Sequence, residues 1–459
     1  AVQSGQLETT SPAALYQALK KESSRKPVFL DAADSYLKGL FRGIEEEGMR
    51  RKAADPDERK NIQKKNRESI RTLNLLWLDE MADSRAQLRE KVAFFWHGHF
   101  AARNLNIFYQ QGLLDTIRTH ALGSFRDLLH SVSKSAAMLN FLNANQNRKD
   151  HPNENFAREV MELFTMGRGN YTELDIKEAA RAFTGWGANM RGEFVFRKFQ
   201  HDYGVKNVLG KRGNFEGEDV LDLLLEQKQT AHFITQKIYR FFVNENIMDQ
   251  KQVNWLADRF YRSDYDIGKL MDDIFTSDWF YQERNIGSRI KSPVELITGM
   301  RRMLPMEIEN KESLLVIQRL LGQILFYPPN VAGWPGGKSW IDSSSLMARM
   351  RLPMLLSDQD EMNIRPKADD DQMMGTEDAM RGGRQGRPIP ADIRWKEYMK
   401  AYDDVKRPLI VQRIQENLLL ASYSLPEAVF VKHADSADRE AFIKSVTIRM
   451  MSTPEYQMC

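Results

Sequence analysis

The chain has 459 residues, which is long enough for one large domain or two ordinary ones. Its 66 Lys and Arg residues against 63 Asp and Glu residues give a formal net charge of +3, which is too close to neutral to predict a nucleic-acid partner. The sequence contains no run of about 18 uncharged apolar residues, so no transmembrane segment is predicted. Cys459 is the one cysteine, so an internal disulfide and a structural zinc site held by several thiolates are excluded.

Apolar residues recur at helical spacing along most of the chain. The predicted helices begin near Ser11 and Pro12 and then cover 31–47, 67–82, 85–98, 110–120, 124–142, two stretches within 153–186, 217–240, 250–262, 266–277, 291–304, 312–325, 343–352, 393–403, 407–420 and 436–452. Between 193 and 209, Phe194 and Phe196 alternate with polar residues, which predicts a short β-hairpin. The expected fold is therefore mainly α.

Composition divides the chain into four expected segments. N-terminal helices occupy 1–84, and the main helical core occupies 85–356. Residues 357–392 have few large apolar side chains and many Gly, Pro and charged residues, which predicts a flexible insertion or linker. The helices of 393–459 are expected to pack back on the core.

The densest set of carboxylates, amides and Arg lies in 143–186. Asn153 is expected to cap a helix whose buried stripe contains Phe156, Val160, Leu163 and Phe164. Glu159 falls at the edge of that stripe, where partial desolvation raises the pKa of a carboxyl group and suits a general acid. The predicted catalytic residues are Glu159, Glu154 and Glu162, and Asn153, Asn155 and Arg158 are predicted to contact substrate.

The same residues also allow a purely structural interpretation. Glu154, Arg158 and Glu162 are linked by i,i+4 spacing, so they can pair with one another and brace neighbouring helices. Thr172 and Asp175 form a predicted capping box for the following helix.

Two histidines in the sequence FWHGHF suggest a divalent metal site. His97 and His99, with His201 and Asp202 from a later segment, offer nitrogen and oxygen ligands for zinc, manganese or iron. On a regular helix, however, His97 and His99 point about 200° apart. The alternative is that these histidines are hydrogen-bonded core residues.

A loop over 328–340, PPNVAGWPGGKSW, carries two indole rings that can stack on sugar rings. Asn330, Trp334 and Trp340 are therefore predicted to bind substrate. Trp186, in the sequence FTGW, is predicted to bind substrate for the same reason. The alternative is a rigid loop pinned by its Trp side chains. The chain contains no P-loop, G-x-G-x-x-G or G-x-S-x-G motif, so nucleotide-dependent and serine-hydrolase functions have no support.

Five motifs in order resemble the bacterial domain of unknown function 1800 family: FWHGHF, PNENFAREVMELFTMGRGNYTELDIKEAARAFTGW, HDYGVKNVLG, KSPVELI and PPNVAGWPGGKSWI. The resemblance covers about 85–352 and returns weakly at the end in STPEYQMC. It implies a mainly helical protein exported to the periplasm or cell surface, often encoded beside an exported sulfatase- or phosphatase-like protein. It brings no established activity or catalytic residues. An LL-x-R-x-GFG motif expected near the start is missing here.

Two functions follow from these features. The first is an exported hydrolase acting on envelope or extracellular polysaccharide, with Glu159 as the acid. The second is a non-catalytic scaffold that binds an exported partner, such as the neighbouring sulfatase- or phosphatase-like protein, through 357–392 and the 22 methionines. An enzyme should bring its polar motif residues together at an open pocket, whereas a scaffold should pair them internally.

Overall fold

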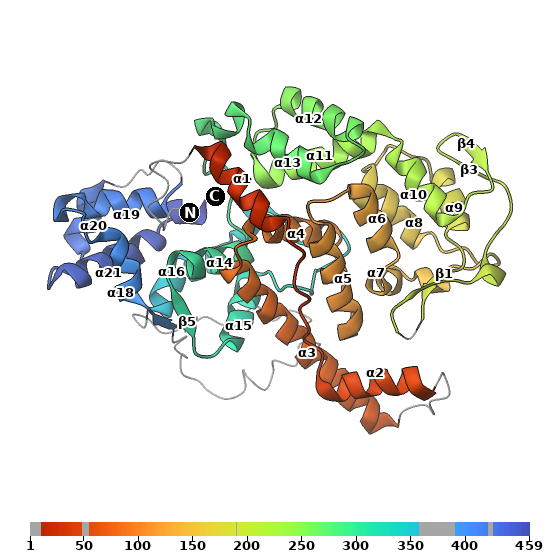
Figure 1. Ribbon diagram of the computed structural model, residues 1–459, viewed down its shortest axis with the longest axis horizontal. Helices are drawn as coiled ribbons and strands as arrows, with labels where there is room; N and C mark the ends of the chain where they lie inside the picture. Colours follow the sequence, from red (N-terminus) through yellow and green to blue (C-terminus); the bar gives the residue numbers. More distant parts are fainter. Residues whose placement is uncertain (1–10, 48–54, 190, 358–390, 421–425) are drawn as a thin grey trace.

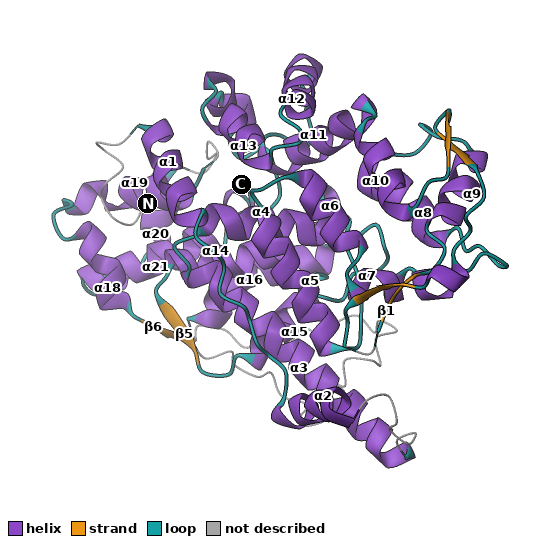
Figure 2. Cartoon of the chain, turned by 45° about the vertical axis from the view of Figure 1, so that its right-hand side comes forward, coloured by secondary structure: helices purple, strands orange, loops and turns teal. Residues whose placement is uncertain are grey.

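The structure is a computed structural model that describes residues 11–47, 55–189, 191–357, 391–420 and 426–459. It is mainly α, as predicted, and Figures 1 and 2 show its helices arranged in four groups. The central group contains α1 (Pro12–Ser23), α3 (Pro56–Asp83), α4 (Gln87–His99), α5 (Ile107–His120), α14 (Pro293–Met303), α15 (Glu312–Leu321) and α16 (Ser343–Leu356). The helix α2 (Ser35–Glu47) and the start of α3 project from this group (Figure 1).

The other three groups surround the centre (Figure 1). The group at the right contains α6 (Phe125–Ser133), α7 (Ala136–Phe141), α8 (Asn155–Glu159), α9 (Glu173–Ala182) and α10 (Gly217–Leu225). The group at the top contains α11 (Lys228–Phe242), α12 (Gln250–Arg262) and α13 (Ile267–Phe275). The group at the left contains α18 (Trp395–Met399), α19 (Ile410–Leu418), α20 (Glu427–His433) and α21 (Arg439–Met451).

The strands form short antiparallel pairs, but not the single hairpin predicted at 193–209. The strand β2 (Phe194–Phe196) pairs with β1 (Trp186–Ala188), and β3 (Lys206–Val208) pairs with β4 (Lys211–Gly213). The alternation of apolar and polar residues therefore predicted the strands correctly but not their pairing. The strands β2 and β3 do not pair with each other, because each pairs with a strand that is nearer to it in the sequence.

A third pair joins β5 (Met306–Ile308) to β6 (Ala391–Ile393). Most of the insertion predicted at 357–392 lies outside the described residues, so the division into four segments stays a prediction. No helix in the described part of the chain has both the length and the apolar composition needed to cross a bilayer.

Side-chain caps fix several helix starts where the sequence predicts them. The Ser11 hydroxyl accepts a hydrogen bond from the amide of Ala14 at 3.3 Å, with Pro12 in the first turn of α1. Thr172 and Asp175 form the predicted reciprocal capping box at the start of α9. These caps satisfy amide groups that have no partner within the helix.

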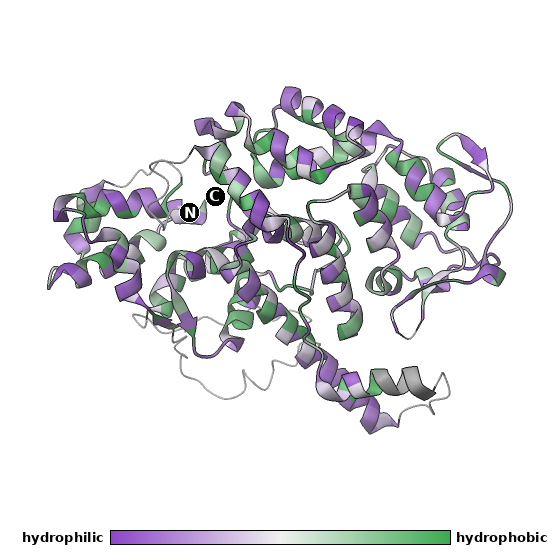
Figure 3. Cartoon of the chain, viewed as in Figure 1, coloured by the Kyte–Doolittle hydropathy of each residue, from purple (hydrophilic) through white to green (hydrophobic). Residues whose placement is uncertain are grey.

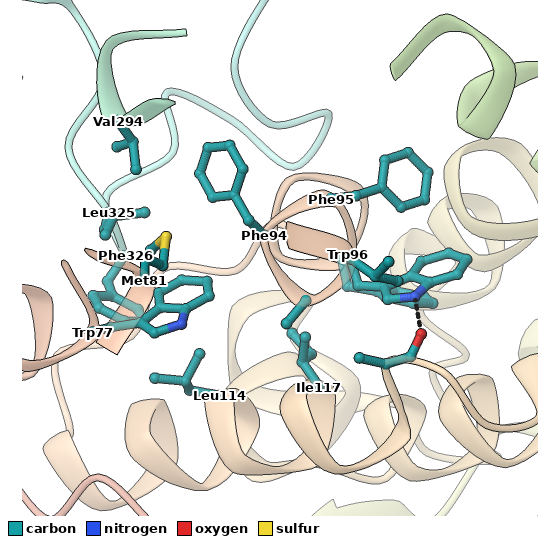
Figure 4. Packing of buried hydrophobic residues seen from close by; sticks show 14 of the residues in the cluster. Trp77, Met81, Phe94, Phe95, Trp96, Leu114, Ile117, Val294, Leu325 and Phe326 are labelled. Atoms are coloured by element: carbon teal, nitrogen blue, oxygen red, sulfur yellow. Dashed lines mark hydrogen bonds between the residues drawn. The ribbon is translucent and has the colours of Figure 1, made fainter. Parts of the chain in front are cut away.

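One part of the hydrophobic core lies where α4 packs against α3 and α5 (Figure 4). Trp77 and Trp96 are fully buried, and the indole nitrogen of Trp96 donates to the carbonyl of Ala121 at 3.1 Å. Apolar residues on the helices gather toward the interior and polar residues toward solvent (Figure 3). Burial of large side chains of this kind contributes about 1.5–3 kcal/mol each to folding.

A buried charge network crosses this core. Arg118 on α5 donates to both carboxylate oxygens of Glu90 on α4, at 2.9 and 3.0 Å, and to Glu80 on α3 at 3.0 Å. Arg89 also pairs with Glu90, and the Trp77 indole donates to Glu90 at 3.0 Å. Only 1% of the side-chain surface of Glu90 and of Arg118 is exposed, so each charge depends on the other for compensation.

We expect Glu90→Gln to lower the free energy of unfolding by about 3–5 kcal/mol, because it leaves the buried guanidinium of Arg118 undercompensated. Urea unfolding followed by circular dichroism measures the change. Arg212→Gln on the exposed strand β4 is the control and should change stability by less than about 0.5 kcal/mol. A loss below about 1 kcal/mol for Glu90→Gln would show that the network does not depend on the Glu90 charge.

Candidate functional site

A cleft with aromatic walls has a volume of about 500 Å³ and lies where α4, α11 and the loop 328–340 meet. A cleft of this size accommodates a small molecule or a short segment of a polymer. Its apolar lining residues are Phe94, Phe95, Phe241, Trp334 and Trp340. Its polar and small lining residues are Gly98, His99, Lys237, Arg240, Glu245, Arg289, Ser292, Gln323 and Gly336.

Two sequence motifs meet at this cleft. The loop 328–340 lies directly on the end of α4, because a Cβ atom at Gly333 would be 2.5 Å from the carbonyl oxygen of Gly98. Gly333 also has φ +82°, a conformation that favours glycine. The close approach places the Trp334 ring 5.4 Å from the ring of His97. Glycine at this position is therefore what brings the indole to the wall of the cleft.

A third motif reaches the cleft wall through a π-helix, η4 (Val160–Thr165), that follows α8. Its wider turns end with Met166 donating to the carbonyl of Met161 at 2.9 Å. Its last carbonyls, on Leu163 and Phe164, accept side-chain hydrogen bonds from outside the helix. The negative end of a helix is a favourable place for a cation.

Lys237 and His99 supply those hydrogen bonds. The Lys237 ammonium lies 3.2 Å from the carbonyl of Leu163 and 3.1 Å from Nδ1 of His99. Nε2 of His99 lies 3.2 Å from the carbonyl of Phe164, which can only accept, so Nε2 carries the proton and Nδ1 accepts from Lys237. Two of the three ammonium hydrogens are thus held by protein, and the third remains for a ligand.

Burial shifts the pKa values of both groups. Desolvation lowers the pKa of Lys237 to about 8. Desolvation also holds the pKa of His99 well below its usual range, with the nearby Lys237 charge acting in the same direction. At neutral pH His99 is therefore a neutral acceptor, while Lys237 is protonated and close to its titration point.

Glu245 is the carboxylate of the cleft. It follows the end of α11 and lies against the glycines of the loop 328–340, since a Cβ atom at Gly337 would be 2.9 Å from its Oε1. Burial raises the pKa of Glu245 above its usual value, and the nearby Arg289 charge partly opposes this. Lys237 and Glu245 thus have pKa values shifted toward neutrality within one cleft, which is a mark of functional sites.

A cluster of three charged side chains, one of which lines the cleft, lies beside it. Arg289 and Lys91 both pair with Glu295 on α14, and the guanidinium of Arg289 also stacks 4.6 Å from the centre of the Phe241 ring. These cations hold the pKa of Glu295 well below its usual range despite burial. Ser292 caps α14 in a reciprocal capping box with Glu295. The charge of Arg289 is therefore already engaged within the protein.

The predicted metal ligands have separate partners. His97 is buried, and its Nε2 accepts from the amide of Phe326 at 3.3 Å. His201 lies beside Thr184, and Asp202 pairs with Arg181 at 2.7 Å. Among the described residues no three or more His, Cys, Asp or Glu side chains gather as a ligand set. The structure therefore does not bring the four predicted ligands together.

The predicted catalytic carboxylates lie outside the cleft lining. Arg158 pairs with Glu154 at 3.1 Å and with Glu173 at 2.7 Å, and Glu162 pairs with Arg168 and accepts from the hydroxyl of Tyr171. The pair of Arg158 with Glu154 is the one that the i,i+4 spacing predicts, whereas Glu162 pairs with Arg168 in place of Arg158.

Glu159 is half-buried and makes no hydrogen bond with any described residue. Burial raises its pKa, as its place at the edge of the apolar stripe predicts, and the nearby Glu162 charge adds to the effect. Its role as an acid stays a prediction, because no residue of α8 lines the cleft.

The predicted substrate contacts separate into two sets. Trp334 and Trp340 line the cleft. Trp186 is buried against Phe183 in the right-hand group. Of the remaining four, Arg158 pairs with Glu154 and Glu173. The three asparagines organise backbone turns: Asn153 accepts from the amide of Asn155, Asn155 donates to the carbonyl of Leu142, and Asn330 accepts from the amide of Ala332.

Sequence reasoning missed the charged residues of the cleft: Lys237, Arg240, Glu245 and Arg289. One signal could have found Lys237. Phe233, Lys237 and Phe241 recur four residues apart, so the lysine occupies the apolar stripe of α11. Glu245 and Arg289 have no comparable signal, because only the tertiary fold brings them to the cleft.

We expect competitive acylation to show Lys237 reacting with a pH midpoint of about 8, because only the neutral amine reacts and burial lowers its pKa. Ordinary exposed lysines titrate near about 10.4 and serve as internal controls in the same sample. Mass spectrometry of peptides labelled across a pH series gives the profile of each lysine. A Lys237 midpoint close to that of the exposed lysines would contradict the desolvated environment.

The chain matches the family described as Protein of unknown function (DUF1800) over residues 3–458. The match extends beyond the 85–352 region that carries the sequence motifs and covers nearly the whole chain. No curated protein and no solved structure matches the chain. The geometry and chemistry of the cleft are therefore the basis for a function.

Proposed function

The chain belongs to the DUF1800 family, and we propose that it is an exported enzyme that hydrolyses an envelope or extracellular polysaccharide bound in the cleft. The observation that carries this proposal is the meeting of Lys237 and Glu245, both with pKa values shifted toward neutrality, in a cleft with aromatic walls. Indole rings such as that of Trp334 present apolar faces that stack on sugar rings.

The protonation states at neutral pH assign the roles. Lys237 is mainly protonated below its pKa of about 8, so it can donate a proton to the leaving glycosidic oxygen. Glu245 in its ionised form can accept a proton from the attacking water, and burial raises its pKa and so makes it a stronger base. His99 holds the ammonium in place through a neutral ring nitrogen. The oxygen of water bonds to the anomeric carbon as the bond from that carbon to the leaving oxygen breaks. Lys237 loses one proton to the leaving oxygen and Glu245 gains one from the water, and proton exchange with solvent then restores both side chains.

A scaffold remains the second candidate, favoured by exposed apolar side chains on the right-hand group. Phe199 is 93% exposed, and Leu174, Tyr203 and Val205 are each more than half exposed. Such surfaces are typical of protein contacts. A scaffold would retain an exported partner after the charges of Lys237 and Glu245 are removed, whereas an enzyme would lose turnover.

We expect Glu245→Gln and Lys237→Met each to lower the hydrolysis rate by about 10²- to 10⁴-fold, because each removes a group that transfers a proton. Reducing ends released from peptidoglycan, alginate, polygalacturonate and dextran measure turnover. Glu159→Gln is the matched comparison, since it neutralises a carboxyl with a raised pKa outside the cleft lining. Loss of activity in Glu159→Gln with full activity in Glu245→Gln would move the acid–base site to α8.

The pH profile of kcat/KM is expected to be bell-shaped. The rate falls as pH rises through about 8, because Lys237 loses the proton it must donate. The rate also falls at acid pH, where Glu245 becomes protonated at a pH above the usual titration range of Glu. The residual activity of Glu245→Gln should lack the acid limb and retain the alkaline limb. An alkaline limb near the ordinary lysine value of about 10.4 would exclude Lys237 as the acid.

A further inference from the structure

The charges lining the cleft are unbalanced. Lys237, Arg240 and Arg289 line it together with one carboxylate, Glu245. The entire chain of 459 residues has a formal net charge of only +3, so this excess of two positive charges is a strong local concentration. An apolar wall beside such a group strengthens its field, because less water is present to screen it.

The protein neutralises only part of this charge itself. Arg289 is engaged with Glu295 and with the Phe241 ring. Lys237 donates to His99 and to a backbone carbonyl, but it has no carboxylate within salt-bridge distance among the described residues. A desolvated ammonium without a counter-ion is costly, and an anionic ligand would offset that cost.

Among the described residues, Arg240 is the cation of the cleft that has no hydrogen-bond or ion-pair partner. It is exposed on α11, one turn after Lys237, and none of its guanidinium nitrogens makes a hydrogen bond or an ion pair with a described residue. Its charge acts on Glu245 without direct contact. A guanidinium presents paired N–H donors that match the two oxygens of a carboxylate or sulfate group.

We propose that the cleft takes an acidic polysaccharide and that Arg240 is the residue that recognises the charged group on the sugar. This inference rests on the proposed function and adds the chemical class of substrate. The ring of the sugar lies on the aromatic wall that includes Trp334, and its carboxylate or sulfate lies at the Arg240 guanidinium. Uronic acids and sulfated sugars share this chemistry, and the experiment below distinguishes them.

The test compares polymers that share one backbone: dextran, carboxymethyl dextran and dextran sulfate, with polygalacturonate as a natural uronate. Affinity electrophoresis of the full chain in gels containing each polymer measures binding. Arg240→Gln is expected to weaken binding to the acidic polymers about tenfold, a loss of about 1.4 kcal/mol, and to leave binding to dextran unchanged. Preference for carboxymethyl dextran and polygalacturonate identifies a carboxylate, and preference for dextran sulfate identifies a sulfate.

Arg212→Gln is the matched control, because it removes the same charge from an exposed strand outside the cleft lining. Equal weakening by Arg240→Gln and Arg212→Gln would show general attraction between a cation and a polyanion and would overturn the proposal. Failure of the wild-type chain to bind any of the three acidic polymers would overturn it too.

Hydrolysis and recognition of the acidic group can be tested separately. Lys237→Met and Glu245→Gln should still bind an acidic polymer through Arg240 while losing hydrolysis. If the protein releases reducing ends from neutral dextran and Arg240→Gln does not change the rate, the proposed hydrolase function stands and the proposal of an acidic substrate is overturned. If an acidic polymer binds through Arg240 but no polymer is hydrolysed, the proposed recognition by Arg240 stands and the proposed hydrolase function is overturned.

Discussion

The hydrogen bonds from Lys237 and His99 to the end of η4 are the interaction on which the cleft depends. They join α4, α11 and the π-helix at one point, although these elements are far apart in the sequence. A helix that ends in free carbonyls offers a favourable place for an ammonium group within an otherwise apolar wall. Gly167 lies two residues after the end of η4, with φ +78°, and a Cβ atom there would lie 2.7 Å from the Phe233 ring. The close packing of α11 on this turn therefore requires glycine.

The sequence motifs serve two physical purposes in the fold. Most charged residues of 143–186 pair with one another, as Arg158 does with Glu154 and Glu173, and these pairs brace the right-hand group. The motifs FWHGHF and PPNVAGWPGGKSW instead contribute His99 and Trp334 to the cleft. The charged residues of 143–186 thus pair mostly with one another, whereas residues of FWHGHF and PPNVAGWPGGKSW line the same cleft. The densest cluster of charge in a sequence need not be its reactive site, because a solvated helix face also favours paired charges.

Local physics explains which features could be predicted from the sequence. Helical periodicity and the Thr172 capping box depend on residues a few positions apart, and both predictions are confirmed. Strand pairing in 193–209 was wrong because register is decided by turns and neighbours beyond the segment. The regular helix predicted through Phe164 is instead a π-helix over its last turn, and its final carbonyls accept hydrogen bonds from Lys237 and His99. The charged part of the cleft could not be found because its residues meet only in the tertiary fold.

Desolvation shifts the pKa values of Lys237 and Glu245 in opposite directions, and this has a chemical consequence. Burial disfavours the charged form of any group, so it lowers the pKa of Lys237 and raises that of Glu245. The two values approach each other without the groups having to form an ion pair that would hold both charges fixed. A single apolar wall can therefore keep an ammonium ready to donate a proton and a carboxylate ready to accept one over the same pH range. Separate burial of each group, rather than direct pairing, is what makes the cleft suited to acid–base chemistry.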